Sequence, residues 1–309
     1  MKKMVIGTRG SKLAMVQTET IAAEIRRIHP DIEVCIKQIT TQGDRDSTAR
    51  LENIAGLGVF VKELEEALLD RRIDLAVHSL KDITTEIMPE LRLVSVTQKA
   101  DSRDVFISLG KTLEEMPSSA KIGTGSLRRA IQLKVYRPDL EICSIRGNID
   151  TRIRKVTEGE YDGTILAAAA LERLKLKTAT YEYLSKERFL PAVGQGALAL
   201  EVCSDNNEVI RAVAPLNHLP TWQSITAERA FLKALGGGCR APIAALGTVT
   251  SKFLRLEGMV GSISRNKLLQ SFEEGVAEDA VSIGMKLAEK LLGMGGNEFI
   301  AEVREDENR

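Results

Sequence analysis

The chain of 309 residues is poor in aromatic residues and has no excess of charge of either sign. Phe, Trp and Tyr make up only 4% of the sequence, which argues against a protein that stacks single-stranded nucleic-acid bases on aromatic rings. Lys plus Arg and Asp plus Glu both number 43, so the overall positive field that non-specific nucleic-acid binding needs is missing. We therefore expect no nucleic-acid partner, and recognition of any anion must come from local clusters of basic residues.

Cysteine is also scarce. Cys35, Cys143, Cys203 and Cys239 are far apart and form no C-x-x-C pair, which argues against a zinc site and against a disulfide framework. We predict no metal. Cys239 differs from the other three because it directly follows the glycines at 236–238.

Long hydrophobic runs are absent. No stretch approaches the roughly 20 apolar residues that span a bilayer, and the N-terminal lysines lead into polar residues 8–11 before an apolar signal core can form. We expect a cytoplasmic protein with no membrane partner. The remaining composition, 43% hydrophobic and 28% charged, is typical of a globular protein of two or three domains.

What is present is an alternation of strand and helix patterns, which predicts an α/β protein with a largely parallel sheet. The first series comprises strands at 4–7, 32–36 and 73–77 and helices at 11–28 and 59–72. Strand-like runs of a second series lie at 105–109, 121–124, 140–145 and 164–170. A later strand at 197–202 resembles a return to the first sheet. The polar segment 40–58 is too long for a simple connection, and we interpret it as a functional or mobile loop.

The pattern changes near residue 218. A helix at 221–235, antiparallel strands at 246–249, 254–260 and 268–272, and a last helix at 277–292 predict a small α+β domain. The tail after Val303 is too charged to pack. The predicted domains are therefore 1–97 with 197–217, then 98–196, then 218–309.

Charged side chains gather where predicted strands end. The buried strand at 73–77 runs into His78-Ser79-Leu80-Lys81-Asp82, and ligands of open α/β sheets bind outside the carboxyl ends of strands. Ile6-Gly7-Thr8 and Ile122-Gly123-Thr124 each precede a Gly-Ser pair at a helix start, where free N–H groups and the helix dipole favour an anion.

Arginines occupy the same kind of turn. A guanidinium fork binds a carboxylate in bidentate geometry, so several converging arginines indicate a polycarboxylate ligand. The arginines at strand-to-helix turns are Arg9, Arg128, Arg129, Arg146, Arg152 and, slightly inside its helix, Arg173.

Seven motifs spread over nearly the whole chain resemble those of the porphobilinogen deaminases, also called hydroxymethylbilane synthases. They lie at 7–14, 60–65, 78–82, 123–129, 146–152, 191–197 and 237–243, the last being Gly237-Gly238-Cys239-Arg240-Ala241-Pro242-Ile243. The resemblance implies two periplasmic-binding-protein-like α/β domains around a cleft and a third, α+β domain that presents Cys239. It also implies hinge motion between domains as the product lengthens.

The resemblance further implies a transferase of tetrapyrrole and haem biosynthesis. Four molecules of the substrate, porphobilinogen, would be joined head to tail into hydroxymethylbilane, with release of ammonia, on a dipyrromethane cofactor held by a thioether to Cys239. Asp82 would be the catalytic carboxylate. It would stabilise the cationic azafulvene left when the aminomethyl group departs, and could assist that departure as general acid. We expect a monomer.

Other residues are assigned by the same resemblance to binding of the cofactor or substrate. They are Arg9, Ser11, Lys81, Thr124, Ser126, Arg128, Arg129, Arg146, Arg152 and Arg173, with Gln195 near the hinge. The chain departs from the family pattern at Leu57, commonly lysine, at Thr84, commonly proline, at Gly125, usually serine, and at Arg240, usually glutamine. Leu57 affects how the loop 40–58 would close over the site.

Two other classes of protein fit parts of the sequence. A small-anion binding protein without catalysis would share the two-domain cleft but would have no use for Cys239. A ligand-sensing regulator needs a DNA-binding element, which this near-neutral sequence does not show.

Overall fold

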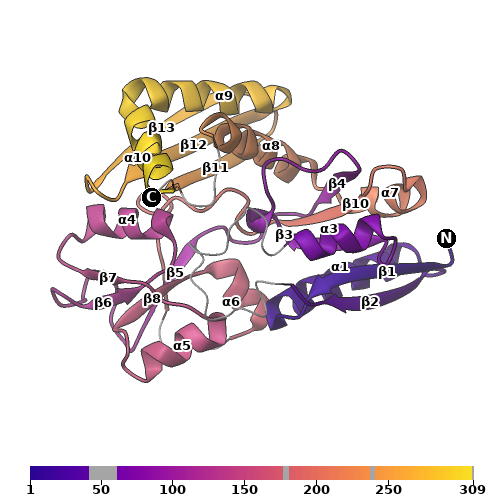
Figure 1. Cartoon of the computed structure of the whole chain (residues 1–309), viewed down its shortest axis with the longest axis horizontal. Helices are drawn as coiled ribbons and strands as arrows, with labels where there is room; N and C mark the ends of the chain where they lie inside the picture. The colour runs from indigo at the N-terminus through magenta and orange to yellow at the C-terminus, as the bar shows by residue number, and fades with distance from the viewer. Residues whose placement is uncertain (42–60, 177–180, 237–240, 308–309) are drawn as a thin grey trace. The chain divides into compact units, whose positions relative to one another are not determined.

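The computed structural model describes residues 1–41, 61–176, 181–236 and 241–307, and the side chains of helical residues 303–307 are not included. Cys239, Arg240, Leu57 and most of the predicted loop 40–58 therefore lie outside the described residues. The chain divides into two compact units (Figure 1). Unit 1 is Met1–Ala100 with Gly196–Trp222, and unit 2 is Asp101–Gln195 with Gln223–Arg309.

Unit 1 is built on a five-stranded sheet with the order β2-β1-β3-β10-β4. Its strands are β1 (Lys3–Arg9), β2 (Glu33–Ile39), β3 (Leu75–Ser79), β4 (Leu91–Val96) and β10 (Leu198–Cys203). Strands β2, β1 and β3 are parallel, whereas β10 runs antiparallel to both β3 and β4. The predicted return of the late strand to the first sheet is confirmed.

Helices cover both faces of this sheet. The helices in the described part of unit 1 include α1 (Lys12–Ile28), α3 (Lys62–Leu69) and α7 (Asn207–Val213), with short 3-10 turns η1 (Leu80–Asp82) and η2 (Ala214–Leu216). Ile21 and Ile25 of α1 pack in one core with Ile6, while Leu64 of α3 packs in another with Ile73. Apolar residues at helical spacing therefore bury α1 and α3 against opposite sides of the strands.

Unit 2 repeats this arrangement in the order β7-β6-β8-β5-β9 (Figure 1). The elements are β5 (Asp104–Ser108), β6 (Lys121–Gly123), β7 (Glu141–Cys143), β8 (Gly163–Ala167), β9 (Tyr181–Tyr183), α4 (Leu127–Tyr136), α5 (Ile149–Thr157) and α6 (Ala168–Leu174). The predicted strand 164–170 is too long. Ala168, Ala169 and Ala170 begin α6 instead, because alanine has the highest helix propensity.

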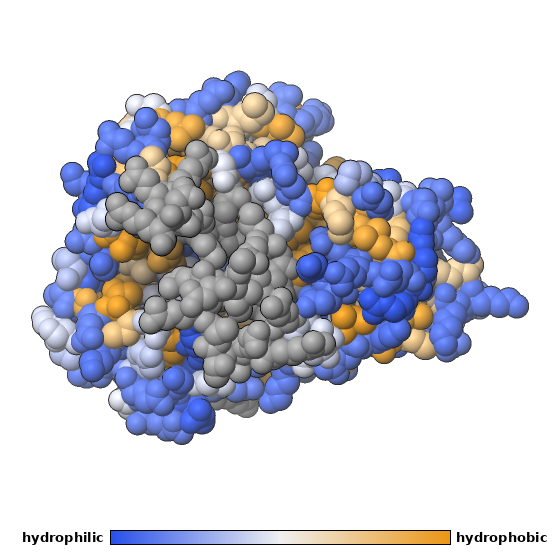
Figure 2. All heavy atoms as spheres, viewed as in Figure 1, coloured by the Kyte–Doolittle hydropathy of each residue, from blue (hydrophilic) through white to orange (hydrophobic). Residues whose placement is uncertain are grey.

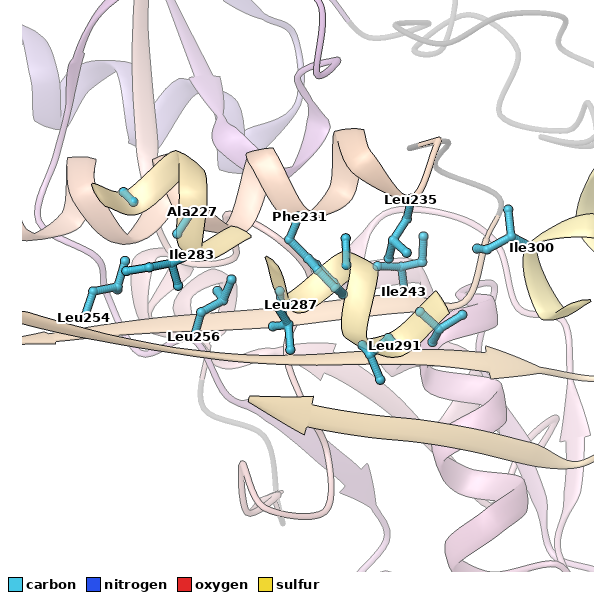
Figure 3. Packing of buried hydrophobic residues seen from close by; sticks show 14 of the residues in the cluster. Ala227, Phe231, Leu235, Ile243, Leu254, Leu256, Ile283, Leu287, Leu291 and Ile300 are labelled. Atoms are coloured by element: carbon cyan, nitrogen blue, oxygen red, sulfur yellow. The ribbon is translucent and has the colours of Figure 1, made fainter. Parts of the chain in front are cut away.

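A second, antiparallel sheet of unit 2 has the order β11-β12-β13. Its strands are β11 (Ile243–Thr250), β12 (Phe253–Ser262) and β13 (Lys267–Val276). The helices of this part of the chain are α8 (Leu219–Ala234), which belongs to unit 2 from Gln223 on, η3 (Ala277–Asp279), α9 (Ala280–Leu291), the π-helical η4 (Leu292–Gly296) and α10 (Asn297–Glu307). Helix α10 was not predicted from the sequence. Figure 3 shows Phe231 of α8 packing with Leu287 of α9 and Leu256 of β12. A Cβ at Gly284 would lie 2.4 Å from the Ala227 carbonyl oxygen, so α8 and α9 touch there.

These three sheets confirm the expected fold class of two α/β domains and a small α+β domain. The domain boundaries predicted from the sequence stay a prediction. No helix among the described residues is long and apolar enough to cross a membrane. On the face displayed in Figure 2, the coloured surface is mainly hydrophilic.

Candidate active site

In unit 1, four of the predicted residues follow the carboxyl ends of neighbouring strands. Arg9 ends β1, and Ser11 caps α1 by accepting a hydrogen bond from the Ala14 N–H. Lys81 and Asp82 lie in η1, directly after β3. Since β1 and β3 are parallel neighbours, both strands end at the same edge of the sheet.

The Asp82 side chain is half-buried and has no hydrogen-bond or ion-pair partner in the described part of the chain. Lys81 beside it is exposed. A partly desolvated carboxylate without a fixed partner can interact with a positive charge that develops on a bound substrate.

In unit 2, the predicted residues from Thr124 to Arg173 follow β6, β7 and β8, and Gln195 comes after β9. Thr124 is buried; its N–H donates to the Cys143 carbonyl and its Oγ1 accepts from the Ser126 N–H at 3.2 Å. Ser126 is the N-cap of α4 but its side chain makes no capping bond. Arg146 follows β7, Arg152 lies in α5 and Arg173 lies in α6.

Asp104, the first residue of β5, is the centre of a buried ionic network in unit 2. It is 0% exposed. Arg128 Nη1 lies 2.8 Å from Asp104 Oδ2, and Arg129 Nη2 lies 2.7 Å from Oδ1. Gln195 Nε2 donates to Oδ1 at 2.9 Å and to the Ser102 carbonyl at 2.8 Å. Three of the predicted binding residues are thus brought together around one carboxylate.

The two arginines of this network also bind backbone carbonyls. Arg128 Nη1 donates to Leu190 O at 2.6 Å, and Arg129 Nη1 donates to Ile165 O at 2.9 Å. The Nε of Arg129 is buried without a partner among the described residues. Arg128 Nη1 thus binds both Asp104 and a backbone carbonyl, whereas Arg129 keeps one buried donor in reserve.

Burial alone would raise the pKa of Asp104. The charges of Arg128 and Arg129 outweigh this effect, so the pKa lies below its ordinary value and the carboxylate stays ionised. Burial lowers the pKa of Arg128, and the negative charge of Asp104 opposes this shift. The network therefore holds two buried positive charges against one negative charge.

Further positive charge lies close to this network. Burial, together with the charges of Arg129 and Arg146, lowers the pKa of Arg152 to about 10. Arg152 Nε donates to the Gly147 carbonyl at 2.8 Å, and no carboxylate among the described residues pairs with it. Burial also lowers the pKa of Arg173, and Glu172 opposes the shift. We call Arg129, Arg146 and Arg152 the arginine cluster.

The backbone at Gly147 lets the cluster form. Gly147 has φ 103°, in the left-handed region, and a Cβ there would lie 2.6 Å from Cγ2 of Thr151. Glycine is therefore required where the chain turns from Arg146 into α5.

Asp104 is the important site residue that the sequence analysis missed. The predicted strand at 105–109 begins directly after Asp104, and the sequence analysis assigns this aspartate no role. The available signal was an aspartate at the start of an otherwise apolar buried strand, Asp104–Ser108, because a charge in such a position needs partners.

The comparisons with known proteins agree with the resemblance. The model of the family "Porphobilinogen deaminase, dipyromethane cofactor binding domain" matches residues 4–211, and that of "Porphobilinogen deaminase, C-terminal domain" matches residues 222–293. The chain is 44% identical to a porphobilinogen deaminase of Roseiflexus sp. (strain RS-1) over 96% of this chain and 98% of the relative. It is 45% identical to a porphobilinogen deaminase of Geobacter sulfurreducens, over 99% of this chain and 96% of the relative.

Among solved structures, the chain is similar to a probable amino-acid ABC transporter extracellular-binding protein, ytmK, of Bacillus subtilis. Sequence identity is 10%, the TM-score is 0.42, and 70% of this chain and 90% of that chain are covered.

Arginines near the ends of strands in two α/β units are the arrangement expected of a protein with a carboxylate-bearing ligand. The family matches make the class specific: the chain belongs to the porphobilinogen deaminase family. The expected family and its transferase class are confirmed, as is a dipyrromethane cofactor. The roles of individual site residues stay predictions.

The Asp104 network gives a prediction about stability. Asp104→Asn leaves Arg128 and Arg129 buried without their counter-charge, and breaking such a pair costs about 3–5 kcal/mol. Because the folded state lowers the pKa of Asp104 below the roughly 3.9 of an unfolded aspartate, its stabilisation is present above that pH and is lost as the pH falls. Urea unfolding should show a deficit in the variant at pH 7 that shrinks below about pH 4.

Asp101→Asn is the matched control. Asp101 pairs with Arg103 at 2.6 Å, but their side chains are 21% and 37% exposed, so we expect a loss of at most about 1 kcal/mol. Equal losses in the two variants at pH 7 would contradict the assignment of Asp104 as a buried hub.

Proposed function

We propose that the chain joins four porphobilinogen molecules head to tail into hydroxymethylbilane, with release of ammonia, using Asp82 for catalysis and the arginine cluster for binding. The observation that carries the binding role is the partly buried positive charge around Arg152, whose pKa is lowered to about 10. Carboxylates would relieve this repulsion, and porphobilinogen carries acetate and propionate groups.

The residues present fit the dipyrromethane cofactor, which also carries carboxylates. Arg129 has a buried Nε without a partner among the described residues, and the Ser126 hydroxyl at the start of α4 makes no capping bond. We assign Arg129, Arg146, Arg152, Ser126 and Thr124 to holding its carboxylates. When bound, the cofactor supplies the free pyrrole carbon from which the chain is extended.

The other assigned residues have distinct parts. Arg9, Ser11 and Lys81 would meet carboxylates at the unit 1 edge, and Arg173 would do so in unit 2. Arg128 and Gln195 would act mainly by holding Asp104, because both are buried and already bonded to it.

Asp82 would act on the substrate in two ways. As carboxylate it would stabilise the positive charge that develops on porphobilinogen when ammonia leaves. As a carboxylic acid it would donate the proton that the departing amine takes up. Its half-buried position strengthens the electrostatic effect because less water screens the charge.

We propose Cys239, outside the described residues, as the attachment point of the cofactor. A thiolate is nucleophilic enough to form a thioether and can serve as a stable tether while the product grows. We further propose a monomer that works in the cytoplasm with porphobilinogen as its only partner.

Asp82→Asn tests the catalytic role. The amide keeps the shape of the side chain but removes the charge and the acid, so the rate of ammonia release in a single turnover should fall by at least roughly 10²-fold. Asp70→Asn, at the C-terminal end of α3 with a side chain that is 62% exposed, should leave the rate unchanged. Near-normal release by Asp82→Asn would show that another group carries the chemistry.

Arg152→Leu tests the arginine cluster. Loss of a partner from a desolvated carboxylate commonly costs about 2–5 kcal/mol, so intact mass should show empty protein or stalled, partly elongated complexes. Arg154→Leu is the matched control, since Arg154 lies on the same helix, is 58% exposed and pairs with Glu158. If Arg152→Leu elongated like the parent, the polyanion-binding role would be wrong.

Peptide mass analysis tests Cys239. Active protein should carry the added mass of one dipyrromethane on the peptide that contains Cys239, and Cys239→Ser should lose both the adduct and product formation. Cys143→Ser, at the half-buried end of β7, should keep both. Fully active protein with unmodified Cys239 would refute the tether.

A further inference from the structure

The turn that carries Asp82 has little structure of its own. It is a single 3-10 turn, Leu80–Asp82, closed by a hydrogen bond from the Ile83 N–H to the Leu80 carbonyl at 3.1 Å. Short 3-10 turns have poor hydrogen-bond geometry. Because the Asp82 carboxylate has no partner among the described residues, its position depends on the end of β3 that precedes it.

His78, four residues before Asp82, fixes that end of β3 from one face of the sheet. His78 Nε2 lies 3.0 Å from Glu201 Oε2 on β10, and the two residues are 4% and 0% exposed. In the register of β3 and β10, Ala199 faces His78 and Glu201 faces Ala76. His78 and Glu201 are thus diagonal neighbours on one face, within reach of long side chains.

Glu201 depends strongly on this bond. Its other oxygen, Oε1, is buried with no partner among the described residues. Burial, and then the charge of Glu201, raise the pKa of Glu65 on α3, while His78 lowers it. A buried polar pair of this kind is a weak source of stability, since apolar residues of similar volume often serve as well. We therefore consider a function for the His78–Glu201 pair other than stabilising the fold.

Ser79 fixes the same strand end from the opposite face. Gln17 of α1, which is 4% exposed, donates from Nε2 to Ser79 Oγ at 2.9 Å. The Leu80 N–H also donates to the Ala197 carbonyl at 3.1 Å. Successive side chains of a strand point to opposite faces, so side-chain bonds hold the end of β3 on both sides just before the turn.

We propose that His78 is a positioning residue, whose hydrogen bond to Glu201 fixes the end of β3 and thereby the place of the Asp82 carboxylate. The proposal rests on the catalytic role of Asp82 proposed above. An error of about 1 Å in the position of a catalytic group can cost about 10²-fold in rate, so loss of this bond should lower kcat. It should change KM less than kcat, because Lys81 is the only residue of this turn that we propose to bind carboxylates, and the arginine cluster lies in unit 2.

His78→Leu and the double variant His78→Leu/Glu201→Leu test the proposal. His78→Leu leaves Glu201 buried without a partner, so both stability and kcat should fall, kcat by at least about 10-fold. The double variant removes the unpaired carboxylate and should regain the thermal stability of the parent but not its kcat. A double variant that regained both would overturn the proposal, because the pair would then be only structural.

Three further variants complete the test, with intact mass confirming equal cofactor content. His78→Gln keeps an N–H donor in reach of Glu201 and should retain kcat within about threefold. Ser95→Ala removes another buried hydrogen bond of the same sheet, from Ser95 Oγ to Val213 O at 2.7 Å, and should cost stability without changing kcat. A fall in kcat equal to that of His78→Leu in either of these variants would contradict the proposal.

In the Asp82→Asn background, His78→Leu should change the residual rate by less than about twofold, since groups that act as a unit are not additive. Additive losses would overturn the proposal. If Asp82→Asn itself were fully active, the catalytic assignment would fail; if it were inactive while His78→Leu kept full kcat, only the positioning role would fail.

Discussion

A buried carboxylate is the interaction on which unit 2 depends. Asp104 is inaccessible to solvent and must be neutralised where it lies. Arg128 and Arg129 do this from the first turn of α4, and Gln195 adds a third bond from a distant part of the chain. The start of α4 is thereby fixed relative to β5, and with it the position of Arg129 in the arginine cluster.

The two α/β sheets have the same strand arrangement but carry different functional groups after equivalent strands. Both have three parallel strands followed by an antiparallel one, and β3 in unit 1 has the same place as β8 in unit 2. The chain leaves β3 through the turn that carries Asp82, but leaves β8 through α6 and Arg173. The duplicated frame thus places a carboxylate in one unit and a guanidinium in the other.

The sequence predicted the strand ends better than the contacts between them. Arg152 and Asp82 could be placed because strand, turn and helix patterns are local and have distinct periods. Asp104 could not be recognised as the partner of Arg128, 24 residues away, because periodicity says nothing of which side chains meet. His78 and Glu201 were missed for the same reason, since their contact depends on the register of β3 with β10. The role of Cys239 came from resemblance alone.

Excess positive charge held by the fold would explain how a chain without net charge binds a polyanion, the role that we propose for the arginine cluster. In water, separate arginines lose most of their attraction to screening. Burial and the guanidinium groups of Arg129 and Arg146 make the protonated state of Arg152 less favourable, and the pKa of Arg152 is lowered for that reason. The folding free energy of the rest of unit 2 offsets this unfavourable interaction. The Asp104 network contributes by holding Arg129 in place. In the proposed function, each carboxylate that enters would gain from charge already in position, without the arginines having to reorganise.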